Sequence, residues 1–302
     1  MVNKNTMELI DLLEKIHNDC DNVPNYKEFS VFDQFNEIAA KFAIDVSKVL
    51  LIITSIQNNI KFPHGYNRDQ ATIVGLMVKI AKDYKYLCNA FIENDSEISS
   101  IFDRSLIEAG TILKYLIKSD ENTRTQFRRA SYRSRIGALK EMDTAKIHDK
   151  MLGAKERVKQ SILEKIKKDG FNLAELLSLQ SSDWKINGLS FRDILTKVGY
   201  GDYYSLSYGI SSDKIHGNWQ ELIEHHLKEK DGYFFPDLSR YPVDPRFISP
   251  ISNLCLDCLV EYLKWTEINQ GALFMLISDL KKYNLKLMEE FETFYHAKWK
   301  GN

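Results

Sequence analysis

Residues that interrupt helices are scarce in this chain. Only six prolines and fourteen glycines are spread over 302 residues, and long stretches contain neither. Within those stretches apolar residues recur every three or four positions, as in the series that begins Ala39, Phe42, Val46. This is the period of an amphipathic helix, and helices without breakers run long. The sequence therefore predicts an all-α protein, a multi-helix bundle with about eight or nine helices.

The same period places the individual elements. We expect helices over residues 7–16, 30–58, 73–91, 98–116, 250–268 and 271–297, and one long or broken helix over the charged stretch 121–169, ended by Gly170. Asn187-Gly188 is a sequence typical of a tight hairpin turn. Residues 232–250 are rich in aromatic residues and proline, which predicts a loop. No clear linker divides the chain.

Composition narrows the class of protein. Hydrophobic residues make up 44% of the chain and charged residues 27%, which is typical of a soluble globular protein. A net charge of −1 argues against a protein that coats nucleic acid through its overall charge, but it leaves local basic patches open.

Cysteine usage and the N-terminus bear on location. The four cysteines lie in apolar helical patterns, as in reduced intracellular proteins, and not in a disulfide framework. The first residues lack the apolar core of a signal peptide. The most apolar run, residues 46–56, is too short to span a bilayer. We therefore expect a cytoplasmic protein that makes no membrane contact.

A polar stripe is the first candidate for a site. Tyr204, Tyr208, Ser212 and His216 follow one another at four-residue spacing, so on a helix they share one slowly drifting face. Histidine titrates near neutral pH and suits general acid–base chemistry. The alternative is structural, because a histidine near a helix C-terminus is often only a favourable charge at the helix dipole.

Two charged stretches are further candidates. Arg104 and Glu108 stand four residues apart on an otherwise apolar helix; they form either a satisfied inward-facing pair or an ordinary surface pair. The segment 124–135 contains five arginines and no acid. Guanidinium groups match phosphate oxygens, so this segment suggests RNA or nucleotide binding; the alternative is a solvated helix face neutralised by acids elsewhere. The arginines are Arg124, Arg128, Arg129, Arg133 and Arg135.

Metal-binding patterns are weak. Cys255 and Cys258 have the spacing of half a zinc site, but the sequence offers no second pair, and buried helical cysteines fit their apolar surroundings better. His225 and His226 follow Glu221, yet adjacent histidines point in different directions on a helix, so we expect them at the surface. No glycine-rich phosphate loop is present. The sequence predicts no metal and no cofactor.

The order of these motifs resembles a known family. Arg104 and Glu108, then the Trp184–Arg192 stretch, then the stripe ending in His216-Gly217 are similar to an uncharacterised bacterial all-helical domain family related to the HEPN superfamily. The resemblance covers roughly residues 68 to 230. It implies a HEPN-like helical core over 67–230, N-terminal helices over 1–66 that pack on it, and an aromatic loop with a C-terminal helical pair over 231–302, or one domain throughout.

The resemblance also implies a function. HEPN proteins are helical bundles, often dimeric, and many are metal-independent ribonucleases in toxin or phage-defence systems. By that resemblance His216, Arg104, Glu108, Ser212 and Tyr208 would form a catalytic site. RNA or a nucleotide would be the ligand, a regulatory protein a partner, and a homodimer the assembly.

One departure from the family pattern keeps a second interpretation open. In HEPN proteins four to six residues separate an arginine from the histidine, and the corresponding positions of this chain, 209–211, hold no arginine. The chain is therefore expected to be either an RNA-acting protein with ribonuclease activity or a non-catalytic helical module that binds a nucleotide, RNA or a partner protein. A third interpretation makes the polar residues a buried network that fixes helix packing.

Overall fold

The computed structural model describes residues 11–12, 15–16, 18–19, 24–144, 152–178, 185–201, 219–241 and 243–299. Its elements are η1 (Tyr26–Glu28), α2 (Phe32–Thr54), α3 (Arg68–Ile92), α4 (Ser96–Ile117), α5 (Glu121–Ser131), α6 (Arg133–Thr144), α7 (Leu152–Lys168), α8 (Leu173–Leu177), α9 (Phe191–Lys197), α11 (Trp219–His225), β1 (Leu227–Lys230), β2 (Tyr233–Pro236), α12 (Pro245–Thr266) and α13 (Gly271–Trp299). The predicted all-α multi-helix bundle is confirmed.

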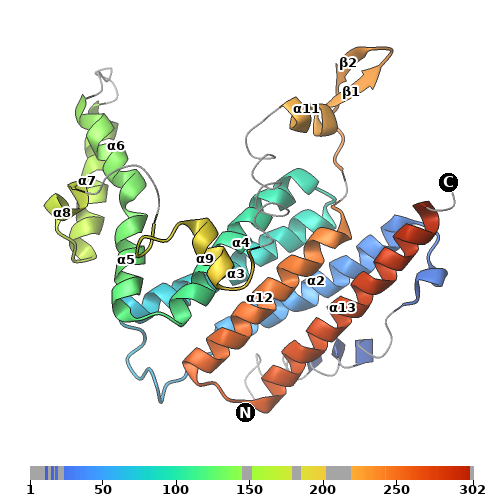
Figure 1. Ribbon diagram of the computed structural model, residues 1–302, viewed down its shortest axis with the longest axis horizontal. Helices are drawn as coiled ribbons and strands as arrows, with labels where there is room; N and C mark the ends of the chain where they lie inside the picture. Colours follow the sequence, from blue (N-terminus) through green and yellow to red (C-terminus); the bar gives the residue numbers. More distant parts are fainter. Residues whose placement is uncertain are drawn as a thin grey trace.

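Five long helices build the body of the protein. α2, α3, α4, α12 and α13 lie side by side, and α12 packs against the other four (Figure 1). Their apolar stripes meet in one core, in which Ile53, Tyr84, Leu113 and Leu259 are fully buried. The core contains residues from α2 to α13. Helices near both ends of the chain therefore bury their apolar faces against helices from its middle. The three expected domains and their boundaries stay a prediction.

Local signals set the ends of these helices. At the start of α3 the Asn67 side chain accepts a hydrogen bond from the Gln70 backbone N–H at 2.9 Å, and the Gln70 side chain accepts one from the Asn67 N–H at 3.0 Å. This reciprocal pair satisfies two N–H groups that a helix start leaves open. Asp95 caps α4, because its side chain accepts a hydrogen bond from the Ile98 backbone N–H at 3.0 Å.

Two smaller units extend from the body (Figure 1). The first, here called the helical arm, comprises α6, α7 and α8, and it has its own small core, which includes Ile136, Ile162 and Leu176. The second comprises α11 and the antiparallel hairpin β1–β2, with Leu227 opposite Pro236. The predicted helix over 121–169 is broken into α5, α6 and α7, and Gly170 follows α7 with a φ of 78°.

The predicted loop over 232–250 is only partly correct. Tyr233–Pro236 form strand β2, and α12 already begins at Pro245. A proline at the first helical position loses no hydrogen bond, which explains why proline starts a helix here and does not prevent one. The predicted hairpin at Asn187-Gly188 is confirmed as a turn with one bridge, Ile186 to Leu189.

Helices α4 and α12 approach each other closely at Gly110. A Cβ atom there would lie 3.1 Å from Cγ of Leu254 and 3.3 Å from Sγ of Cys258. Both contacts are tighter than ordinary van der Waals contact, so glycine allows the two backbones to come together. None of the described helices is long and apolar enough to cross a membrane.

We expect Gly110→Val to lower the free energy of unfolding by about 1–3 kcal/mol, because the extra methyl groups overpack the α4–α12 contact. Urea denaturation followed by circular dichroism measures the change. The matched control is Gly75→Ala in α3, where a Cβ meets nothing within 4 Å; this change should stabilise by up to about 1 kcal/mol. Equal stability of both variants would contradict the close contact.

Candidate functional site

The polar stripe lies outside the described residues. Tyr204, Tyr208, Ser212 and His216 all fall within residues 202–218, between α9 and α11. Their predicted helical spacing and their roles therefore stay predictions. The structure describes the residues on either side of this stretch, up to Gly201 and from Trp219 onward.

Arg104 and Glu108 both lie in α4, as predicted. Glu108 is exposed, and Arg104 is partly buried. Leu106 and Ile107 between them are buried in the core. The Glu108 side chain therefore faces solvent, which argues against an inward-facing Arg104–Glu108 pair.

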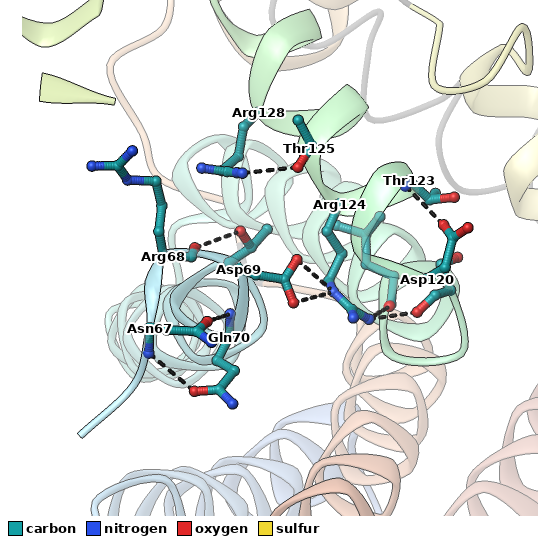
Figure 2. Close-up of polar contacts among 12 residues, drawn as sticks. Asn67, Arg68, Asp69, Gln70, Asp120, Thr123, Arg124, Thr125 and Arg128 are labelled. Carbon is teal, nitrogen blue, oxygen red and sulfur yellow. Dashed lines mark hydrogen bonds and ion pairs between the residues drawn. The ribbon is translucent and has the colours of Figure 1, made fainter. Parts of the chain in front are cut away.

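Arg124 is held by structural contacts at the base of α5. Its Nε donates to both carboxylate oxygens of Asp69, at 2.9 and 2.8 Å, and its Nη1 donates to the carbonyls of Leu116 and Ser119 (Figure 2). The Arg124 side chain is 15% exposed and that of Asp69 is 12% exposed. This guanidinium thus ties α5 to the start of α3 and the end of α4.

Arg128 and Arg129 also contact the protein itself. Arg128 lies 3.4 Å from the Asp169 carboxylate, and its Nη2 donates to Oγ1 of Thr125 at 2.9 Å (Figure 2). Arg129 donates to the Glu175 carbonyl at 3.4 Å. These contacts join α5 to the end of α7 and to α8, so they orient the helical arm.

Arg133 and Arg135 begin α6. Arg133 is partly buried and has a partner. Arg135 is exposed, with its guanidinium carbon 5.8 Å from the centre of the Tyr132 ring. Acids elsewhere in the chain pair with two of these arginines, as the second interpretation of the segment expects. Asp69 pairs with Arg124, and Asp169 pairs with Arg128.

A pocket of about 710 Å³ lies where four segments meet. Its walls are the C-terminal end of α4, the first turn of α5, the 187–189 turn and the end of α9. The Asn187 side chain donates to Oγ1 of Thr123 at 2.7 Å and so fixes the turn against α5. The volume is within the range of small-molecule and cofactor sites.

Three lysines line this pocket: Lys114 and Lys118 from α4, and Lys197 from α9. The Lys197 ammonium lies 5.4 Å from the centre of the Tyr115 ring, and the Lys114 ammonium 5.0 Å from that of Tyr200. Ammonium groups over aromatic faces are attracted by the ring electrons. The pocket therefore combines positive charge with aromatic surface.

Asp120 lines the pocket itself, and its side chain accepts a hydrogen bond from the Thr123 N–H. Two acids behind the pocket lysines, Asp257 and Glu261, are each shared between two lysines. Asp257 lies 2.7 Å from Lys281 and 3.8 Å from Lys114. Glu261 lies 3.8 Å from Lys118 and 4.0 Å from Lys264. One carboxylate neutralises one ammonium, so this edge of the pocket keeps a surplus of positive charge.

The state of Asp257 supports this arrangement. Burial alone would raise its pKa, but hydrogen bonds from Lys281 and from the Tyr200 hydroxyl, at 2.7 and 2.6 Å, together with the charge of Lys114, lower it below the ordinary value. Asp257 is therefore ionised at neutral pH and holds its donors in place. Because Lys281 and Lys114 already balance its charge, Asp257 repels an incoming anion only weakly.

Sequence reasoning missed this pocket. Lys114 and Lys118 are a helical pair, but Asn187 and Lys197 lie some seventy residues further along the chain, by their numbers. Only the packing of α9 against α4 brings them together. The one sequence signal was the Asn187-Gly188 turn, which was interpreted as a fold feature alone.

The predicted burial of the paired cysteines is confirmed. Cys255 and Cys258 lie in the α12 core, and burial raises the pKa of the Cys258 thiol to about 12. These thiols are therefore protonated and unreactive at neutral pH. The surface placement expected for the histidines is wrong for His225, whose side chain is only 13% exposed, while that of His226 is 40% exposed.

Comparison with known proteins gives one match. The model of a family described as a family of unknown function, DUF5677, matches residues 70–234. That range runs from the first turn of α3 through β1 and includes the pocket and the polar stripe. Searches of curated proteins and of solved structures gave no match.

Proposed function

The chain belongs to this family of unknown function, DUF5677, and from its basic pocket we propose that it binds single-stranded RNA. The observation that carries the proposal is the meeting of Lys114, Lys118 and Lys197 with the Tyr115 ring in one open pocket. Proteins that bind single strands combine positive charge for the phosphates with aromatic surface for the bases. The pocket has both.

The pocket also suits RNA better than the arginine segment does. Arg124 and Arg128 are engaged with Asp69 and Asp169, and releasing them would break contacts that hold α5. Lys118, whose side chain is 64% exposed, and the exposed Lys197 stay available to a phosphate, while Lys114 is 13% exposed beside Asp257. We therefore place the RNA phosphates at α4 and α9.

Titration of a short, fluorescently labelled single-stranded RNA tests this part. Lys118→Gln and Lys197→Gln should each weaken binding by about five- to tenfold, because each removes one phosphate contact. Lys282→Gln is the matched control, since Lys282 in α13 is an exposed lysine with a nearby acid and does not line the pocket. Equal binding by all four proteins would contradict the proposal. Competition by a free nucleotide alone would instead favour a nucleotide-binding protein.

The second part of the proposal is cleavage of the bound RNA, as the resemblance to HEPN proteins implies. The ribose 2′-oxygen would attack the adjacent phosphorus, the bond to the 5′-oxygen would break, and a 2′,3′-cyclic phosphate and a 5′-hydroxyl would form. His216 would take the proton from the 2′-hydroxyl or give one to the leaving 5′-oxygen. Ser212 and Tyr208 would orient the phosphate, and Arg104 would stabilise its charge, with Glu108 nearby.

The alternative, a non-catalytic binding module, keeps one specific observation in its favour. Positions 209–211 hold no arginine, and Arg124 and Arg128 are committed to structural contacts. Incubation of the purified protein with total RNA and a metal chelator separates the two. New 2′,3′-cyclic phosphate ends support cleavage, and intact RNA that is still bound supports the module. A place in a toxin or phage-defence system, a regulatory partner and a homodimer belong to the same proposal.

A further inference from the structure

We propose that Glu97, Glu221 and His226 form a binding site for a divalent transition-metal cation of the zinc type. His226 Nε2 lies 3.2 Å from Oε1 of Glu221 and 3.8 Å from Oε2 of Glu97. One ligand atom from each of the three side chains lies within 4.8 Å of the other two. Ligand atoms around a tetrahedral zinc ion are about 3.4 Å apart, from bond lengths near 2.0–2.1 Å. The two separations from His226 are therefore close to this spacing, and small side-chain movements would bring the two carboxylate oxygens within it.

The site is held in place by backbone contacts. Glu97 lies in the first turn of α4, Glu221 in α11, and His226 between α11 and β1. The Ser96 N–H donates to the Tyr241 carbonyl at 3.1 Å, and the Asp237 N–H donates to the His226 carbonyl at 2.8 Å. The first contact joins the segment that follows β2 to the start of α4, and the second closes the hairpin unit at His226. The three side chains therefore converge before any metal ion binds.

Charge gives the second argument. The Glu221 side chain is only 7% exposed, and both carboxylates face the same imidazole nitrogen. That nitrogen carries at most one proton, which it can direct toward one oxygen at a time. A divalent cation between the three atoms would satisfy both carboxylates together, and the neutral imidazole would be a ligand. Buried charges are stable when they are paired or coordinate a metal.

The donor set indicates which metal. One imidazole nitrogen with two carboxylates suits Zn²⁺, and less strongly Mn²⁺, whereas Mg²⁺ prefers oxygen ligands and retains its water. Three protein ligands leave one coordination position open. The site lies at the opposite end of α4 from Lys114 and Lys118, so it is separate from the RNA pocket. Its expected role is to fasten the hairpin unit to the body.

Calorimetric titration of the tag-free, metal-stripped full chain with zinc chloride tests the site. We expect one Zn²⁺ per chain, with tighter binding than Mn²⁺ and much tighter than Mg²⁺. Replacing an outer partner of a metal site typically costs 10–100-fold in affinity, so His226→Ala and Glu97→Gln, which remove direct ligands, should each cost about 100-fold or more. Glu97 is 40% exposed at its side chain, so its variant tests the site even if a Glu221 variant fails to fold.

The matched control is Glu224→Gln. Glu224 lies on the same short helix as Glu221, and its side chain is 68% exposed. This variant should keep the native affinity within about twofold. The proposal is overturned if the native protein binds no zinc, if Glu224→Gln loses as much affinity as Glu97→Gln, or if His226→Ala retains full binding, which would place the ion on other ligands such as the cysteine thiols.

Discussion

Arg124→Ala is expected to lower the free energy of unfolding by about 2–3 kcal/mol. The substitution leaves the Asp69 carboxylate, which is 12% exposed, without its two hydrogen bonds from Nε. It also removes the donor to the carbonyls of Leu116 and Ser119. Breaking one side of a largely buried ion pair costs more than the pair itself contributes, because the remaining charge stays desolvated.

Urea denaturation followed by circular dichroism measures this loss as a lower midpoint at unchanged slope. Arg135→Ala is the matched control, because Arg135 is exposed on the neighbouring helix, and it should change stability by less than about 0.5 kcal/mol. In the double variant Arg124→Ala, Asp69→Ala, part of the loss should be recovered, since no unpaired carboxylate remains. If Arg124→Ala is as stable as Arg135→Ala, the guanidinium is not the structural tie that we describe.

His216→Ala is expected to reduce the rate of RNA cleavage by about 100-fold or more, because positioned acid–base catalysis contributes about 10²–10⁴-fold. The proton transfer at the 2′- or 5′-oxygen would lose its carrier. RNA affinity should stay within about twofold, because in the complex that we propose the lysines of the pocket make the phosphate contacts that set the affinity. Quantification of 2′,3′-cyclic phosphate ends over time, beside a binding titration, measures both quantities.

His64→Ala controls for the loss of a histidine elsewhere, since His64 is exposed in the loop before α3. It should cleave like the native protein. Equal cleavage by His216→Ala and the native protein would remove the acid–base role from His216. A parallel fall in stability, RNA affinity and cleavage would instead assign His216 to helix packing.

Much of the fold could be predicted from the sequence because helical period and breakers are local signals. The apolar series around Phe42 and Val46 predicted α2, and Gly170 marked the end of α7. Strand β2 was missed because it consists of three exposed aromatic residues and Pro236, and a four-residue strand shows too little periodicity to identify. Proline near residue 245 was interpreted as a breaker, although it begins α12.

The candidate site was harder to predict because charge alone does not reveal its partners. The arginines at 124–135 allowed either RNA binding or neutralisation by acids elsewhere, and the sequence could not say that Asp69 and Asp169, far away along the chain, pair with Arg124 and Arg128. The lysine pocket depends on the packing of α9 against α4, which no local pattern encodes. Glu97 and His226 likewise meet only after folding.

We infer that RNA lies in the pocket between α4, α5 and α9. Photo-crosslinking of a 4-thiouridine RNA to the native protein, followed by peptide mapping, tests it most directly. We expect crosslinked peptides from residues 114–123 and 187–198. These crosslinks should be lost in the double variant Lys118→Gln, Lys197→Gln. Crosslinks that map instead to the arginine-bearing start of α6, and persist in that double variant, would contradict it.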